Sequence, residues 1–387
     1  MGLSHPYSFA CSPRTQIGLF ALFRPVVQLA GEMQAIEDWL PARAKPLIIA
    51  GPCSVEREAQ MLLTAKELAS LGVVSALRGG VWKPRTQPGS FEGMGLPALD
   101  WLKNAGRETG LPVMTEVANA RHVEAALAAE IDMLWIGART TVNPFYVQEI
   151  SDALRGVEIP VLVKNPIHPE VKLWLGALER LQKSGINQLA AIHRGFYAYQ
   201  SQPFRNEPKW EVFFELRRLW PELTVICDPS HIAGKSALIG EVCQSALDLG
   251  LDGFMIESHI EPAKALSDAE QQVTPTELGI IQQQLECRSE NPGDPLIIDQ
   301  LEELRQQIDG VDREILIKLQ ERLAIVDKIG PVKYAHGTTI FQMKRWFNVL
   351  ADRKALGKEL NLDEETVHEL FQLIHKYSID RQIQAKP

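Results

Sequence analysis

The chain has 387 residues, of which 45% are hydrophobic and 23% charged, and its formal net charge is −9. These values are typical of a globular protein with two domains, and they exclude a disordered chain. The acidic balance argues against a nucleic-acid partner, and no apolar run reaches the ~20 residues that cross a bilayer. Five widely spaced cysteines without a CxxC pair predict a reduced, cytoplasmic protein.

Residues 1–32 precede the first regular pattern. Within them Ile17–Phe23 is apolar and follows a basic residue, as in a signal peptide, but the run is short and Arg24 interrupts it. Met33 lies directly before the first domain pattern. We therefore expect residues 1–32 to be a poorly ordered N-terminal extension.

From residue 46 onward, a short apolar run followed by an amphipathic helical stretch recurs eight times. The runs are Pro46–Gly51, Ser75–Trp82, Pro112–Val117, Met133–Gly137, Val161–Lys164, Gln188–His193, Thr224–Cys227 and Gly253–Ile256. Such an alternation predicts parallel strands, and eight units over residues 33–285 fit the ~250 residues of a (β/α)8 TIM barrel.

A polar residue lies at or just beyond the end of each run. These residues are Cys53, Lys83, Glu116, Arg139, Lys164, Arg194, His231 and Glu257. The C-terminal strand ends of such a barrel build its active site, so the set is predicted to surround one mouth. Chance would account for any one of these positions, but it accounts poorly for all of them.

Two kinds of chemistry follow from these side chains. A thiol, an imidazole and two carboxylates form a mixed set that suits manganese, iron, cobalt or zinc better than calcium or magnesium: Cys53, His231, Glu257 and Asp268. Six cations near strand ends imply a substrate that carries phosphate or carboxylate groups: Arg78, Lys83, Arg85, Arg139, Lys164 and Arg194. The alternative for the cations is a salt-bridged scaffold.

Short motifs at these strand ends occur in a recognisable order. They are Gly51-Pro52-Cys53-Ser54, Arg78-Gly79-Gly80, Lys83-Pro84-Arg85-Thr86, Ile136-Gly137-Ala138-Arg139-Thr140, Val163-Lys164-Asn165, His193-Arg194-Gly195-Phe196, Asp228-Pro229-Ser230-His231 and Glu257-Ser258-His259. Across nearly all of residues 46–275 the chain resembles the type I-beta group of 3-deoxy-D-arabino-heptulosonate 7-phosphate (DAHP) synthases. The resemblance implies condensation of phosphoenolpyruvate with erythrose 4-phosphate and release of phosphate.

The resemblance also implies roles for single residues. Cys53, His231, Glu257 and Asp268 match the metal ligands of the family, with manganese the first choice. The phosphoenolpyruvate phosphate is expected at Arg139 and Lys164, beside the backbone of Gly137 and Ala138; its carboxylate is expected at Arg78, Lys83 and Arg194. Lys83 is also the expected proton donor, and Arg85 and Thr86 match the site for the aldose phosphate.

A sister family makes an eight-carbon sugar phosphate from arabinose 5-phosphate and is the alternative for the barrel. It typically has Ala-Asn-Arg where this chain has Lys83-Pro84-Arg85. The small regulatory domain that some relatives carry before the barrel is not expected here, because 32 residues are too few for it.

Beyond the barrel, Pro, Gly and Asp residues in 286–296 predict a linker. Residues 297–387 then read as helices, because apolar residues recur at three- and four-residue steps from Leu301 to Ile329. This stretch predicts one long helix, and two or three shorter helices are expected after it, one of them over Glu364–Tyr377. From periodicity alone, a helical cap on the barrel is a reasonable alternative.

Polar positions in 296–385 resemble the all-helical chorismate mutase family. Arg305 and Arg322 match residues that bind the two substrate carboxylates, with Arg305 supplied by the second chain of a homodimer or higher oligomer. Lys333 and Gln382 match the pair at the ether oxygen, and Arg345 and Ser378 match further substrate-binding positions. Three departures are Gln342 and Trp346, where acidic residues that address the substrate hydroxyl are usual, and Pro331 near the end of the long helix.

Three functions remain open for the helical part. The first is a bifunctional enzyme that acts on phosphoenolpyruvate, erythrose 4-phosphate and chorismate. The second is a chorismate- or prephenate-sensing module that inhibits the barrel allosterically. The third is a tail that only dimerises the barrel, which would not need Arg305, Arg322, Lys333 and Gln382.

Overall fold

The computed structural model describes residues 33–40, 43, 45–84, 89–199, 203–288 and 293–385. Its contacts divide the chain into two compact units, one up to Arg288 and one from residue 289 onward. The extension predicted over residues 1–32 lies outside the described residues, and the predicted domain limits remain predictions. The cysteines within the described ranges are unpaired: Cys53, Cys227, Cys243 and Cys287.

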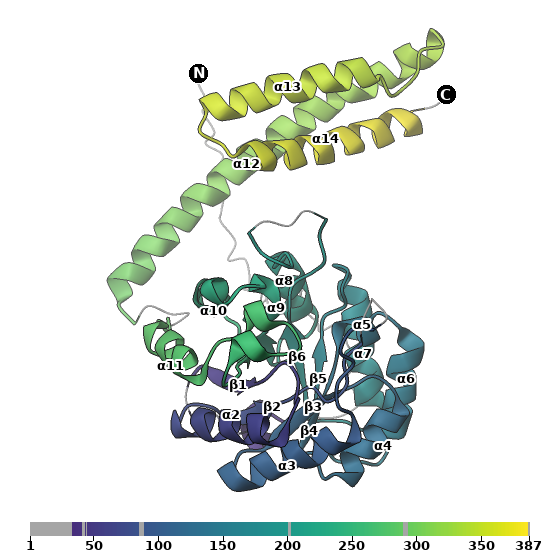
Figure 1. Ribbon diagram of the computed structural model, residues 1–387. Helices are drawn as coiled ribbons and strands as arrows, with labels where there is room; N and C mark the ends of the chain where they lie inside the picture. Colours follow the sequence, from purple (N-terminus) through teal and green to yellow (C-terminus); the bar gives the residue numbers. More distant parts are fainter. Residues whose placement is uncertain are drawn as a thin grey trace, which may run out of the picture. The chain divides into compact units, whose positions relative to one another are not determined.

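The first unit is a closed barrel of eight parallel strands that pair in sequence order, β1 with β2 through to β8 with β1 (Figure 1). The strands are β1 Leu47–Gly51, β2 Ala76–Arg78, β3 Val113–Val117, β4 Met133–Ile136, β5 Val161–Lys164, β6 Leu189–His193, β7 Val225–Cys227 and β8 Gly253–Glu257. Each lies within its predicted run or extends one residue beyond it. The predicted barrel fold is confirmed.

Helices surround this barrel, and the longer ones bury apolar residues against it. The longer ones are α2 Glu58–Ser70, α3 Leu96–Thr109, α4 Ala120–Ala128, α6 Pro144–Ala153, α7 Val171–Lys183, α8 Trp210–Leu219, α10 Ile239–Asp248 and α11 Pro275–Gln284. The short ones are α1 Ile36–Trp39, α5 Ala138–Thr141 and α9 Pro229–Ala233. In α7, for example, Trp174, Leu178 and Leu181 are all buried, which gives the helical spacing of an inward stripe.

Two apolar layers hold the barrel together. Side chains inside it, such as Met114, Trp135 and Ile226, form one buried cluster, and Ile36 and Leu40 join that cluster from the chain before β1. A larger cluster fills the space between the strands and the outer helices. Because the interior is packed, the chemistry is confined to the mouth at the C-terminal strand ends.

Gly51 ends β1 with φ +152°, and a Cβ there would lie 2.0 Å from the backbone oxygen of Arg78. We expect Gly51→Ala to destabilise the barrel by about 3 kcal/mol or more, because backbone strain and a clash with rigid backbone add together. Gly72→Ala is the matched control, since Gly72 has φ +72° but nothing within 4 Å of its added Cβ. Urea unfolding should show a clearly larger loss for Gly51→Ala; equal losses would contradict this account.

The second unit consists of three helices, α12 Pro295–Ala335, α13 Met343–Glu359 and α14 Glu364–Gln384 (Figure 1). α14 packs on both α12 and α13. The tight approach of Val367 to Gly357, and of Gln382 to Gly330, shows why small residues lie at these crossings. α12 continues past Pro331 to Ala335, so the proline does not end the helix.

Much of α12 is left uncovered by the other described helices of its unit. Residues 295–318 are all exposed, although many of them are apolar. The exposed apolar residues of this stretch are Leu296, Ile297, Ile298, Leu301, Leu304, Ile308, Val311, Ile315, Leu316 and Ile317. Across the described ranges, no helix has the length and apolarity to cross a membrane.

Candidate active sites

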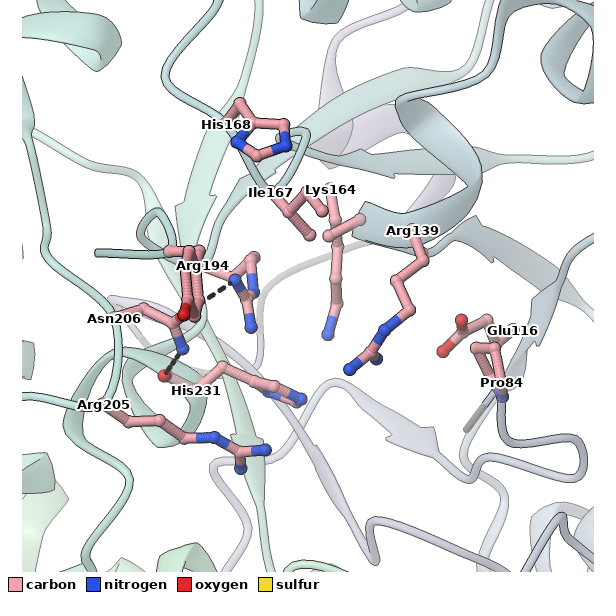
Figure 2. Close-up of a pocket in the computed structure, with 13 residues that line it drawn as sticks. Pro84, Glu116, Arg139, Lys164, Ile167, His168, Arg194, Arg205, Asn206 and His231 are labelled. Atoms are coloured by element: carbon pink, nitrogen blue, oxygen red, sulfur yellow. Dashed lines mark hydrogen bonds between the residues drawn. The ribbon is translucent and has the colours of Figure 1, made fainter. Parts of the chain in front are cut away.

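A cavity of about 520 Å³ opens at the mouth of the barrel (Figure 2). Four cations face it: Arg139, Lys164, Arg194 and Arg205. Gly137 and Ala138 also line it, as predicted, and His231 closes one side. The structure therefore brings most of the predicted substrate-binding residues of the barrel to one space.

Local structure fixes how these cations point. Arg139 lies in the first turn of α5, a helix that begins directly after the extended Gly137, and Lys164 is the last residue of β5. The Arg194 backbone N–H donates to Asn165 Oδ1 at 2.6 Å, and the Arg194 guanidinium donates to Asn206 Oδ1 at 2.9 Å. Burial lowers the pKa of Arg194 to about 10, so the side chain remains charged at neutral pH.

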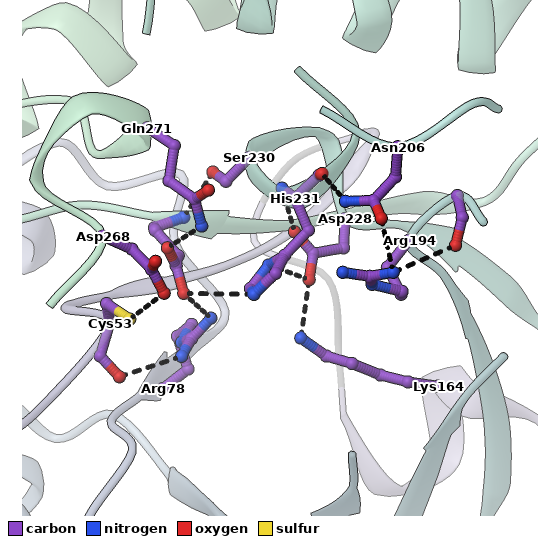
Figure 3. Close-up of polar contacts among 12 residues, drawn as sticks. Cys53, Arg78, Lys164, Arg194, Asn206, Asp228, Ser230, His231, Asp268 and Gln271 are labelled. Carbon is purple, nitrogen blue, oxygen red and sulfur yellow. Dashed lines mark hydrogen bonds and ion pairs between the residues drawn. The ribbon is translucent and has the colours of Figure 1, made fainter. Parts of the chain in front are cut away.

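Asp228 connects the cavity to a second group of side chains (Figure 3). Its Oδ2 lies 2.6 Å from Lys164 Nζ and 2.8 Å from His231 Nδ1. Burial alone would raise the pKa of this carboxyl, but the charges of His231 and Lys164 hold it well below its ordinary value. Since Asp228 occupies Nδ1, the other ring nitrogen of His231 faces Glu257, 3.9 Å from Nε2 to Oε1.

Next to His231 lie three potential metal ligands. One donor atom each from Cys53, Glu257 and Asp268 falls within 4.8 Å of the others. Cys53 Sγ is 3.3 Å from Asp268 Oδ2, and with His231 Nε2 the group offers sulfur, nitrogen and oxygen donors (Figure 3). This donor set fits a divalent transition metal.

Charge supports that fit. Burial, together with the charges of Glu257 and Asp268, raises the pKa of the Cys53 thiol to about 12, although Lys83 and Arg78 act in the opposite direction. Two carboxylates beside this thiol place negative charge at the group, and Arg78 and Arg205 offset part of it through their ion pairs with Glu257 and Asp268. A divalent cation would offset the remainder, so the donor geometry and the charge of the group both accommodate one.

Arg78 and Lys83 contact these donors directly, without being part of the cavity lining. Arg78 Nη1 lies 3.0 Å from Glu257 Oε1, and Arg78 Cζ lies 4.9 Å from the centre of the Trp135 ring. Lys83 Nζ lies 3.0 Å from Cys53 Sγ. Arg85 and Thr86, predicted to bind the aldose phosphate, lie outside the described residues.

Three polar side chains at this mouth were missed from the sequence. Arg205 Nη1 donates to Asp268 Oδ1 at 3.2 Å, Asn206 Nδ2 donates to the His231 carbonyl at 2.6 Å, and Gln271 Nε2 donates to Glu257 Oε2 at 2.7 Å. Each lies well beyond its strand end, so a search confined to strand ends does not reach them. The sequence does contain one sign of them: Arg205 and Asn206 are adjacent polar residues in the long connection between β6 and α8, which could have been predicted to reach the mouth.

In the helical unit, some predicted residues meet and others do not. Arg322 Nη1 donates to Ser378 Oγ at 2.5 Å, and Gln382 Nε2 donates to the Ser378 carbonyl at 3.1 Å. Lys333 Nζ donates to the Ile340 carbonyl at 2.6 Å. Arg345 is exposed on α13.

Arg305 does not reach this group. It is exposed on α12 near Glu302, with 3.8 Å between Nη1 and Oε2. It precedes Arg322 by 17 positions, about 25 Å along the helix axis at 1.5 Å per residue. Within one chain, therefore, the two arginines cannot bind the same small molecule.

Comparison with known proteins adds to this geometry. Residues 40–291 match the model of the DAHP synthetase I family, and residues 304–383 match that of chorismate mutase type II. The chain is 34% identical over 224 residues to a phospho-2-dehydro-3-deoxyheptonate aldolase of Thermotoga maritima, covering 58% of this chain and 64% of that protein. It thus spans slightly less than two thirds of that relative.

A second kind of relative is more distant. The chain is 26% identical over 242 residues to a 2-dehydro-3-deoxyphosphooctonate aldolase of Acidithiobacillus ferrooxidans, covering 57% of this chain and 81% of that protein. Among solved structures, the Thermotoga maritima DAHP synthase matches with a TM-score of 0.56 and 31% identity, covering 61% of this chain and 67% of that one.

Proposed function

The chain belongs to the DAHP synthetase I family, and from that membership we propose that its barrel condenses phosphoenolpyruvate with erythrose 4-phosphate. The product would be 3-deoxy-D-arabino-heptulosonate 7-phosphate, with release of inorganic phosphate. The observation that carries the proposal is the cavity in which Arg139, Lys164, Arg194 and Arg205 face one space beside the Cys53–Glu257–Asp268 group.

The cations account for binding and orientation. Both substrates are anions that repel each other in water, and a fixed set of guanidinium and ammonium groups offsets that repulsion while holding the reacting carbons close. Arg139 and Lys164 would take the phosphate of phosphoenolpyruvate, and Arg194 its carboxylate. Lys83, whose ammonium lies 3.0 Å from Cys53 Sγ, would deliver a proton from Nζ beside the metal ligands.

Cys53, His231, Glu257 and Asp268 would hold the metal, and we infer manganese before iron, cobalt or zinc. When bound, such an ion acts as a Lewis acid on a carbonyl oxygen. Other side chains would orient these ligands through direct contacts. Asp228 contacts His231, Gln271 contacts Glu257, and Arg205 contacts Asp268.

The choice of aldose distinguishes this reaction from that of the more distant relatives. We expect phosphate release from phosphoenolpyruvate with erythrose 4-phosphate to exceed that with arabinose 5-phosphate by about 10-fold or more in kcat/KM, because Lys83-Pro84-Arg85 departs from the Ala-Asn-Arg of the sister family. Inorganic phosphate and consumed phosphoenolpyruvate would be measured with each sugar. A preference for arabinose 5-phosphate would assign the barrel to the other reaction.

For the helical unit we propose rearrangement of chorismate to prephenate. The reaction is pericyclic, so it needs a compact bound conformer and positive charge near the breaking ether bond rather than a nucleophile or base. Arg322, Lys333, Ser378 and Gln382 would supply one side of the site. The match to chorismate mutase type II over residues 304–383 supports this assignment.

The site would be completed by a second chain. The exposed apolar residues between 295 and 318 of α12 are the surface that such a partner would cover. Arg305 lies in that stretch, and a second copy running alongside it would bring its own Arg305 to the first chain's Arg322. We therefore propose a homodimer, or a higher assembly built on it.

A second role for this unit is binding of chorismate or prephenate without turnover, as an inhibitory sensor for the barrel. The replacement of an acidic residue by Trp346 favours it. Formation of prephenate by the intact chain would exclude a purely sensing role, whereas tight binding of prephenate without turnover would establish it.

A further inference from the structure

Trp346 and His375 form an aromatic pair in the helical unit. Trp346 lies in the first turn of α13 and His375 on α14, and their ring centres are 4.1 Å apart with 27° between the ring planes. Phe341 contacts the same imidazole edge-on, with 5.9 Å between ring centres. Two rings from the α12–α13 side thus fix the plane of the His375 imidazole.

Two of the proposed substrate-binding cations, Arg322 and Lys333, act electrostatically on this imidazole. Phe341 directly follows Ile340, whose carbonyl accepts from Lys333 Nζ at 2.6 Å. Ser378 lies one turn along α14 from His375 and accepts from Arg322 Nη1 at 2.5 Å. Burial and the charges of Arg322 and Lys333 lower the pKa of His375, which favours the neutral form of its ring.

The ring nitrogens of His375 are available to a ligand. Within the residues that the structure describes, no protein atom forms a hydrogen bond with either of them. The charges that act on Arg322 and His375 in these ranges come from cations: Arg353 on Arg322, and Arg322 and Lys333 on His375. A neutral group that both donates and accepts therefore lies among positive charges.

Chorismate offers four polar groups: two carboxylates, an ether oxygen and a secondary hydroxyl on the ring. Cations suit the carboxylates and the ether oxygen, whereas a hydroxyl needs an acceptor or a donor; with Trp346 in place of the usual acidic residue, a neutral imidazole offers one of each. We propose that His375, held in place by stacking on Trp346, binds the ring hydroxyl of the substrate and selects for it. This inference rests on the proposed mutase function of the helical unit.

The test compares chorismate with the analogue that lacks the ring hydroxyl, using the full-length chain. We expect His375→Ala to lower kcat/KM about 10-fold for chorismate and less than 2-fold for the analogue, since one hydrogen bond contributes roughly this factor. His336→Ala is the matched control, because His336 is an exposed histidine at the C-terminal end of α12. It should leave both substrates unchanged.

The role of Trp346 is positioning, and conservative replacement tests it. Trp346→Phe keeps a ring against His375 and should retain most of the discrimination between the two substrates, whereas Trp346→Ala should lose it. If His375→Ala slows both substrates equally, the residue is only structural and the inference is overturned. If the unaltered chain neither converts nor binds chorismate, the proposed mutase function itself fails, and the inference fails with it.

Discussion

A Cys53→Ala chain is expected to lose its transition metal and at least about 100-fold of its phosphate-releasing activity, because a Lewis acid contributes several kcal/mol to such a step. The thiol is fully buried and within reach of Glu257 and Asp268, so water cannot simply replace it. Metal content by elemental analysis and the rate with phosphoenolpyruvate and erythrose 4-phosphate measure the two losses.

Cys243→Ala provides the control. Cys243 is equally buried, but it lies in the apolar core on α10, away from any cluster of metal-binding side chains within the described residues. That variant should keep both metal and activity. A chelator should abolish phosphate release from the unaltered chain and leave chorismate turnover unchanged, since the pericyclic reaction uses no metal. Full activity of metal-free protein would contradict the proposed site.

Arg322→Ala is expected to reduce chorismate turnover by about 100-fold or more, while phosphate release by the barrel stays unchanged. Two charge-assisted hydrogen bonds from one guanidinium to a carboxylate contribute about 3–6 kcal/mol together. Because Ser378 already holds this guanidinium in place, the Arg322 side chain loses little conformational entropy when the substrate binds. Lys328→Ala, an exposed cation on the same helix outside the stretch 295–318, is the control and should retain turnover.

Mixed dimers extend this test to the proposed assembly. Arg305→Ala and Arg322→Ala chains should each be nearly inactive alone. A dimer of one chain of each kind contains one site with both arginines intact and one with neither, so mixing should restore part of the turnover. If mixing restores nothing although mixed dimers form, the two arginines do not meet across an interface.

The barrel could be predicted well from the sequence because each of its strands, and the polar residue that follows it, can be recognised from a few neighbouring residues. Each strand is a short apolar run, and the polar residue after it must lie at the mouth, so Lys164, Arg194 and Glu257 follow from their position alone. Contacts between distant elements could not be predicted in this way. The pairing of Arg78 with Glu257 joins residues 179 positions apart, and Arg205 reaches Asp268 from inside a long loop.

The helical site was less accessible to sequence reasoning for a physical reason. Spacing along a helix shows which residues share a face, but not which helices meet. The Arg322–Ser378 bond and the Trp346–His375 pair both depend on how α14 lies against α12 and α13. Arg305 and Arg345 are exposed and stay apart from this group in a single chain; in the proposed dimer, a second copy would supply Arg305.

Asp228 has a consequence beyond its role as an anchor. One oxygen of this carboxylate contacts both Lys164, proposed to bind a substrate phosphate, and His231, proposed to bind the metal. If these two proposed roles hold, a phosphate that draws the ammonium away would leave more of the carboxylate's charge on the imidazole and make that ring a stronger electron donor. The affinities for the anion and for the metal would then be thermodynamically linked, and each ligand would change the affinity for the other by the same factor.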